Sequence, residues 1–167
     1  MTAIPVRHPA SSQSRRLDTA MKISDFLSPV DVLVDMRTPD KPRLLRELAQ
    51  RAADALGLPA DPIATALLAR EGLGSTGTGG GIAIPHARIA AVTQPFGVLA
   101  KLQQPIDFDA IDGAPVDLVF VLLLPLAPQG DQLGALAAVA RKLRAPPDLA
   151  RMRQAKDPAG LYSAICE

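Results

Sequence analysis

The most informative stretch of this chain is GSTGTGGGIAIPH, which occupies residues 74–86. Glycine supplies six of the ten residues from Gly72 to Gly81, and this composition predicts an irregular loop because glycine tolerates backbone conformations that interrupt helices and strands. The apolar residues 82–84 then predict a short strand that Pro85 ends. His86 is therefore expected just past a strand end, where side chains commonly meet solvent or a ligand.

Helices are expected before this loop, and buried strands and further helices after it. Asp40-Lys41-Pro42 predicts the cap and first turn of one helix, which Gly57 closes, and Asp61-Pro62 predicts the start of a second in the same way. The predicted strands span residues 32–34, 82–84, 96–102 and 116–124, with a turn at residues 112–113. The predicted helices span residues 41–56, 61–71, 133–143, 148–154 and 157–165.

The order of these elements indicates the fold class. Helices before, between and after buried strands predict one α/β layered domain with a mixed β-sheet flanked by helices, since the short link near Asp112 favours an antiparallel neighbour. Residues 116–124 are apolar on both faces, which is typical of a central strand. In the helix after Gly130 we expect the inner face to carry Leu133, Leu136, Ala137, Ala140 and Leu143.

Composition excludes several classes of protein. The 167 residues fit one domain, and 48% hydrophobic and 21% charged residues with a net charge of +1 are typical of a folded globular chain. Nucleic-acid binding is not expected, because no basic stripe is present, only 3% of residues are aromatic and tryptophan is absent. The longest apolar run, residues 118–127, is about half a membrane-spanning helix and contains Pro125, so no membrane insertion is expected.

The termini bear on domain boundaries and location. Residues 1–20 lack the apolar core of a signal peptide and the periodicity of a packed element, so we expect a disordered tail followed by a domain over residues 21–167. Cys166 is the single cysteine and has no partner for an internal disulfide, which favours a reducing, cytoplasmic location.

His86 is the candidate for chemistry, because the other histidine, His8, lies in the expected tail. A histidine that accepts a phosphoryl group needs a free ring nitrogen and donors for the incoming oxygens. Backbone N–H groups of the glycine loop are such donors, and nearby side-chain donors are Arg70, Ser75, Thr76 and Arg88. The alternative is a histidine that only caps a strand and is satisfied by a backbone carbonyl.

Other sites fit this sequence poorly. Gly72, Gly74 and Gly77 match the spacing of a dinucleotide-binding loop, but a helix precedes them and a strand follows, the reverse of that motif. The P-loop pattern fails because Gly80 stands where lysine is required. The aspartates at positions 107, 109, 112 and 117 are explained by turns, with no histidine or cysteine to complete a ligand set. We expect neither a metal nor a cofactor.

Residues 74–86 resemble the active-site signature of phosphotransferase-system enzyme IIA domains, of the fructose/mannitol and nitrogen-regulatory branch. The resemblance extends through Arg70-Glu71 before the loop and through residues 105–113 and 115–118 after it, and residues 21–29 look like the usual opening of the nitrogen-regulatory type. It implies a mixed sheet flanked by helices and a phosphotransferase activity. It also implies that His86 accepts phosphate through Nε2 from an HPr-like phosphocarrier, with Arg70 holding the phosphoryl oxygens. The phosphoryl-binding loop would comprise Ser75, Thr76, Gly77, Gly79, Gly80 and Gly81.

The chain departs from the family pattern at three places. The family usually has Asn where this chain has Gly80, and Gly-Lys where it has Ala87-Arg88. A second histidine usually opens the helix after the last strand, at the position that Gln132 occupies here. The Gln132 amide can donate a hydrogen bond to a phosphoryl oxygen but cannot become cationic, so it should stabilise phospho-His86 less than a histidine would. Gln132 and Arg88 are therefore interpreted as candidate supporting residues for the phosphoryl group.

Three functions compete at this stage. The first is a regulatory phosphocarrier whose phosphorylation controls its binding to downstream proteins of nitrogen or potassium balance. The second is a sugar-specific IIA component that passes phosphate to a IIB domain. The third is a binding module that has lost catalysis through its departures at Gly80 and Gln132.

Overall fold

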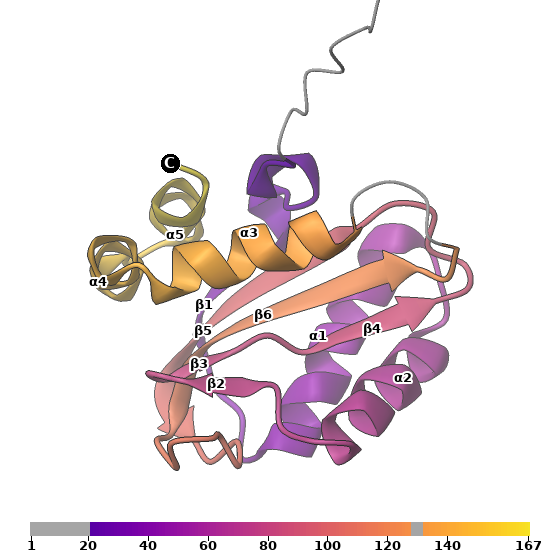
Figure 1. Ribbon diagram of the computed structural model, residues 1–167, viewed down its shortest axis with the longest axis horizontal. Helices are drawn as coiled ribbons and strands as arrows, with labels where there is room; N and C mark the ends of the chain where they lie inside the picture. The colour runs from indigo at the N-terminus through magenta and orange to yellow at the C-terminus, as the bar shows by residue number, and fades with distance from the viewer. Residues whose placement is uncertain (1–20, 128–131) are drawn as a thin grey trace, which may run out of the picture.

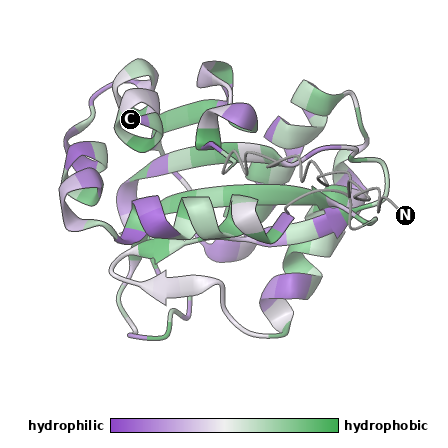
Figure 2. Ribbon diagram, turned by 45° about the horizontal axis from the view of Figure 1, so that its top comes forward, coloured by the Kyte–Doolittle hydropathy of each residue, from purple (hydrophilic) through white to green (hydrophobic). Residues whose placement is uncertain are grey.

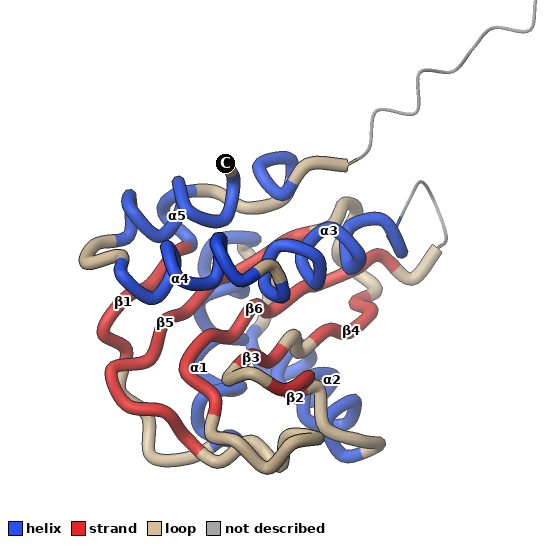
Figure 3. The backbone as a smooth tube through the Cα atoms, turned by 60° about the vertical axis from the view of Figure 1, so that its left-hand side comes forward, coloured by secondary structure: helices blue, strands red, loops and turns tan. Residues whose placement is uncertain are grey.

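The computed structural model describes residues 21–127 and 132–167. The tail expected at residues 1–20 lies outside the described residues. Within them, a mixed sheet is covered by α1 and α2 on one face and by α3, α4 and α5 on the other (Figure 1). A tube drawing shows the strands as one layer between these helices (Figure 3).

The sheet has the strand order β1-β5-β6-β3-β2, and β4 also pairs with β6. The strands are β1 Val32–Met36, β2 Gly77–Gly79, β3 Ile82–Ala83, β4 His86–Ile89, β5 Phe96–Ile106 and β6 Val116–Pro125. β6 runs antiparallel to β5 and parallel to β3 and β4, and β1 runs parallel to β5. The prediction of a mixed sheet with β6 at its centre is confirmed.

The helices are α1 Lys41–Leu56, α2 Ala60–Gly72, α3 Gln132–Arg144, α4 Pro146–Gln154 and α5 Pro158–Cys166. Two 3-10 turns, Ile23–Asp25 and Pro29–Asp31, precede β1. The carboxylate of Asp40 accepts a hydrogen bond from the Arg43 N–H at 2.9 Å, and Gly57 ends α1 at φ 66°. Both ends of α1 are therefore capped as the sequence predicts. Among the described residues, no helix combines the length and apolarity needed to cross a membrane.

Several element boundaries differ from the prediction by a few residues, and two of the differences have a clear physical reason. α2 begins at Ala60 with Pro59 at its cap position, so Asp61 lies inside the first turn, where its charge suits the helix dipole, instead of capping it. β5 continues past Leu102 to Ile106, because β6 offers a partner there: after a register shift, Ile106 pairs with Val116.

The glycine stretch is also more regular than expected. Gly77–Gly79 forms β2, which pairs antiparallel with β3. His86 lies just past the end of β3, as expected, but it also begins a further strand, β4, and its Cα lies opposite that of Leu122. The reason is the length of β6, which pairs first with β3 and then, beyond Pro85, with β4.

The predicted inner face of α3 is partly wrong. The buried residues of this helix are Gln132, Ala135, Val139 and Leu143, whereas Leu133 is 76% exposed. The buried residues recur three or four positions apart, so they form one stripe that faces the core. Leu133 is left on the side that faces the pocket of His86.

The sheet separates two apolar cores, and the long strands are hydrophobic over most of their length (Figure 2). Along β6, Val119, Val121 and Leu123 join the core under α1 and α2, whereas Leu118, Phe120 and Leu122 join the other. The Phe120 ring meets Phe26 edge-on at 6.1 Å between centroids. Gly97 permits this packing, because a Cβ there would lie 2.7 Å from the Phe120 ring.

Candidate functional site

His86 is half-buried at the start of β4, and its ring is held by the main chain. Nδ1 lies 2.8 Å from the carbonyl oxygen of Ile84. Because a carbonyl can only accept, Nδ1 must carry the proton in this contact, and the lone pair of the neutral ring is then on Nε2. The strand-capping contact considered from the sequence is therefore present, but it engages only one of the two ring nitrogens.

His86 lines an open pocket of about 580 Å³ together with two arginines, Arg70 and Arg88. The remaining lining is apolar: Ala66, Ala69, Leu73, Ala87, Leu124, Leu133 and Leu136. Leu73 and Leu133 are 86% and 76% exposed. The site thus combines an imidazole and two cations within an apolar surround.

Arg70 lies in the last turn of α2 and donates from Nη1 to the carbonyl of Gly74 at 2.8 Å. A guanidinium has five N–H donors, so this contact orients the group and leaves other donors for an anion. The structure brings Arg70 and His86 to one pocket, although they belong to different elements, α2 and β4.

Arg88 is held by Gln132, which begins α3 and is 5% exposed. Arg88 Nη1 donates to Gln132 Oε1 at 2.8 Å, and Gln132 Nε2 donates to the carbonyl of Ala127 at 2.6 Å. Gln132 is not among the residues that line the pocket. Its described contact with the site is made through Arg88.

Ser75 and Thr76 direct their side chains to protein groups. Ser75 Oγ donates to the Phe108 carbonyl at 2.7 Å and accepts from the Gly77 N–H at 3.0 Å. Thr76 Oγ1 donates to Glu71 Oε2 at 2.5 Å. Both hydroxyls thereby fix the path of the loop.

The glycines after Thr76 belong to a hairpin that is tied to the loop between β5 and β6 and to α4. The Gly80 N–H donates to Asp112 Oδ2 at 3.0 Å, and the Gly80 carbonyl accepts from Arg153 at 2.6 Å. The backbone hydrogen bonds that Gly80 and Ala114 donate to Asp112 hold the pKa of its carboxyl below the ordinary value. None of the six predicted loop residues, Ser75, Thr76, Gly77, Gly79, Gly80 and Gly81, is among the described residues that line the His86 pocket.

The four aspartates considered as a cluster have separate partners. Asp107 accepts from the Asp109 N–H, Asp109 pairs with Lys41, and Asp117 pairs with Arg153. Sequence reasoning missed the pair of Lys41 and Glu71, whose charged atoms lie 3.1 Å apart next to the loop. The position of Glu71 directly after Arg70 at the helix end could have marked it as a candidate site residue. Its partner Lys41 could not be found in the same way, because it lies 30 residues upstream.

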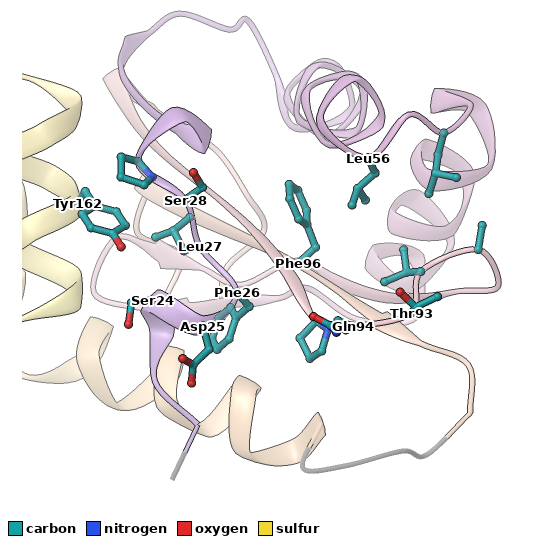
Figure 4. A pocket seen from close by; sticks show the side chains of 15 residues that line it. Ser24, Asp25, Phe26, Leu27, Ser28, Leu56, Thr93, Gln94, Phe96 and Tyr162 are labelled. Atoms are coloured by element: carbon teal, nitrogen blue, oxygen red, sulfur yellow. The ribbon is translucent and has the colours of Figure 1, made fainter. Parts of the chain in front are cut away.

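A second cavity, of about 570 Å³, lies between the first 3-10 turn, the end of α1 and the loop before β5 (Figure 4). Its lining includes Asp25, Phe26, Thr93, Phe96 and Tyr162. No histidine, lysine or arginine is among its described lining residues. It therefore offers neither a nitrogen nucleophile nor a cation, and the His86 pocket is the better candidate for phosphoryl chemistry.

Comparison with known proteins agrees with this geometry. Residues 25–167 match the family described as phosphoenolpyruvate-dependent sugar phosphotransferase system, EIIA 2. The chain is 40% identical over 145 residues to a nitrogen regulatory protein of Bradyrhizobium diazoefficiens, which covers 87% of this chain and 95% of that protein.

Two solved structures share the fold. The nitrogen regulatory protein IIA-Ntr of Neisseria meningitidis superposes with a TM-score of 0.81 at 33% identity, covering 86% of this chain and 98% of that one. The mannitol enzyme IIA of Escherichia coli, solved in complex with phosphorylated enzyme IIB, gives 0.68 at 14% identity, covers 81% of this chain and 93% of that one, and supports the fold alone. The expected fold and family are both confirmed, and the chain belongs to the EIIA 2 family of the phosphoenolpyruvate-dependent sugar phosphotransferase system.

Proposed function

We propose that this protein is a nitrogen-regulatory phosphocarrier in which His86 accepts a phosphoryl group on Nε2 from an HPr-like protein and then passes it on. The observation that carries the proposal is the hydrogen bond from His86 Nδ1 to Ile84, which leaves Nε2 as the nucleophile in a pocket with Arg70 and Arg88. The similarity to nitrogen regulatory proteins supports the branch of the family.

The transfer is a displacement at phosphorus. The Nε2 lone pair of His86 forms the new N–P bond while the N–P bond of the donor phosphohistidine breaks, and its electron pair returns to the donor ring. Charge on the three equatorial oxygens is then neutralised by Arg70 and Arg88. The Nδ1–H to Ile84 contact stabilises the positive charge that develops on the His86 ring.

The pocket is open enough for a second protein to reach His86. The exposed Leu73 and Leu133 at the pocket form an apolar surface beside a polar centre, a combination typical of protein contacts. We assign this surface to the HPr-like donor and to downstream regulated proteins.

The lone cysteine, Cys166, supports a cytoplasmic location, and the family match over residues 25–167 supports the domain at residues 21–167.

A IIB domain is the second candidate acceptor. The mannitol enzyme IIA that shares this fold was solved in complex with phosphorylated IIB, and the family description names sugar systems. The same pocket would then serve both donor and acceptor in turn.

Intact-mass measurement tests the function. The protein is incubated with phosphoenolpyruvate, enzyme I and an HPr-like carrier, and we expect a mass gain of one phosphoryl group. His86→Ala should abolish the gain while retaining the wild-type melting curve, and His8→Ala, which removes the other histidine, should retain the gain. Phosphorylation of the His86→Ala variant would refute the proposal.

A further inference from the structure

Glu71 is a buried carboxylate that the transfer step does not use. Its side chain is 4% exposed, and burial of a charge is costly unless partners compensate. Oε2 accepts from the Thr76 N–H at 3.0 Å and from Thr76 Oγ1 at 2.5 Å, while Oε1 accepts from Lys41 Nζ at 3.1 Å. Glu71 therefore joins α1 to the main chain of the loop before β2.

The hydrogen bonds continue from Thr76 to the His86 ring. The Thr76 carbonyl accepts from the Ile84 N–H at 3.1 Å, and the Ile84 carbonyl accepts from His86 Nδ1 at 2.8 Å. The position of Thr76 thus sets the position of Ile84, whose carbonyl selects the ring tautomer. Each link in this path is a direct contact, so displacement of Thr76 would reach the nucleophile.

Lys41 supplies the charge that makes the buried carboxylate tolerable. Its Nζ also donates to the Phe108 carbonyl at 3.1 Å and to Asp109 Oδ2 at 3.0 Å. Burial acts to lower the pKa of Lys41, but the hydrogen bonds and charges of Asp109 and Glu71 outweigh it and raise the pKa above its ordinary value. Lys41 thus remains cationic at neutral pH.

The place of Lys41 in its helix supports a role beyond helix stability. Lys41 is the first residue of α1, where a cation opposes the helix dipole. Its contacts with Glu71 and Phe108 also lie next to Ser75, which binds the same Phe108 carbonyl. Lys41 therefore stabilises the loop, although its charge interacts unfavourably with the dipole of its own helix.

We propose that Lys41 and Glu71 are positioning residues for phosphoryl transfer, which hold Thr76 and Ile84 so that the His86 ring keeps its proton on Nδ1 and its lone pair on Nε2. This inference rests on the proposed function of His86. Neither residue contacts the phosphoryl group; both act through the main chain of the loop.

The test combines ring spectroscopy with kinetics on Glu71→Gln and Lys41→Met. Nitrogen-15 NMR of the unphosphorylated protein reports the His86 tautomer, and we expect the Nδ1–H form to lose population in both variants. The rate of phosphorylation at saturating carrier should fall on the order of tenfold, since small misplacement of a reacting group is costly. The KM for the carrier should change little, because Leu73 and Leu133 are untouched.

Two further variants separate positioning from general stability. Lys41→Arg keeps the charge and several donors, so it should recover most of the rate and the wild-type tautomer. Lys101→Met is the matched control: Lys101 also donates to two carbonyls, those of Arg153 and Ala155, but on the other face of the sheet. It should leave both the tautomer and the rate at wild-type values.

The outcomes distinguish this inference from the proposed function. A wild-type protein that takes up no phosphoryl group refutes the function, whatever the tautomer. If the wild type takes up a phosphoryl group but the Glu71→Gln and Lys41→Met variants keep the wild-type tautomer and rate, the inference is overturned and the proposed function stands. If either variant fails to fold, Glu71→Asp replaces it, because the shorter side chain keeps the carboxylate but cannot reach both Lys41 and the Thr76 N–H. An unchanged tautomer and rate in Glu71→Asp overturn the inference equally.

Discussion

Replacement of Gln132 by leucine should slow phosphorylation of His86 without destabilising the fold. Gln132 is 5% exposed and its Oε1 accepts the hydrogen bond from Arg88 Nη1 at 2.8 Å. Leucine has a similar size and suits a buried position, but it cannot accept from Arg88. The carbonyl of Ala127, which loses its Gln132 donor, belongs to an exposed residue and can bond to water.

The size of the effect follows from this single contact. A hydrogen bond to a charged group contributes up to about 3 kcal/mol, and we take about 1 kcal/mol here because Arg88 is exposed. Without this hydrogen bond the Arg88 guanidinium can move away from the phosphoryl oxygens, and we expect the activation free energy to rise by this amount, about 1 kcal/mol. It corresponds to about a fivefold lower rate.

The assay is a time course of phosphoryl uptake from the phosphorylated HPr-like carrier, with Arg88→Ala and the Gln132→Leu/Arg88→Ala double variant beside it. If Gln132 acts through Arg88, its replacement should have no further effect once Arg88 is gone. A Gln132→Leu rate equal to the wild-type rate, or an effect that persists undiminished in the Arg88→Ala background, would refute the reasoning.

Two further predictions concern the glycine hairpin. Gly80 has φ 69° and open space where a Cβ would lie. Gly80→Asn should therefore leave the melting temperature nearly unchanged, whereas Gly80→Val should lower it, because asparagine tolerates the left-handed region and a β-branched residue does not. Equal melting temperatures for the two variants would contradict this prediction. The pKa of Asp112 lies below its ordinary 3.8 because Gly80 and Ala114 donate backbone hydrogen bonds to it, so its contribution to stability is present above pH 3.8 and is lost as the pH falls through the lower folded-state pKa. Acid unfolding should accordingly depend less steeply on pH in Asp112→Asn, and an identical acid profile would show that the contact is not made in solution.

The fold could be predicted largely from local sequence signals. The caps at Asp40 and Gly57 depend on residues close in the chain, and the apolar run of β6 marks a central strand wherever it is placed. The strands that the sequence did not predict are those for which pairing across the sheet decides the outcome. β2 and β4 are short, and they are strands because β3 and β6 offer them partners.

The candidate site divides in the same way. His86, Arg70 and the glycine stretch could be found from the sequence, because a histidine, an arginine and a conspicuous loop stand close together in it. The hydrogen bond from His86 to Ile84 spans two residues, yet its direction depends on how the strand is held by Thr76 and by β6.

The sequence by itself determined the α/β class of this domain and the choice of His86 as its candidate nucleophile. The class follows from periodicity and helix capping, and the choice follows because the chain has only two histidines. Only the tertiary structure decided which groups surround that histidine. Arg88 meets Gln132 across 44 residues, and Lys41 meets Glu71 across 30. Contacts over such separations have no local signature, since one joins β4 to α3 and the other joins α1 to α2, and only the fold brings these elements together.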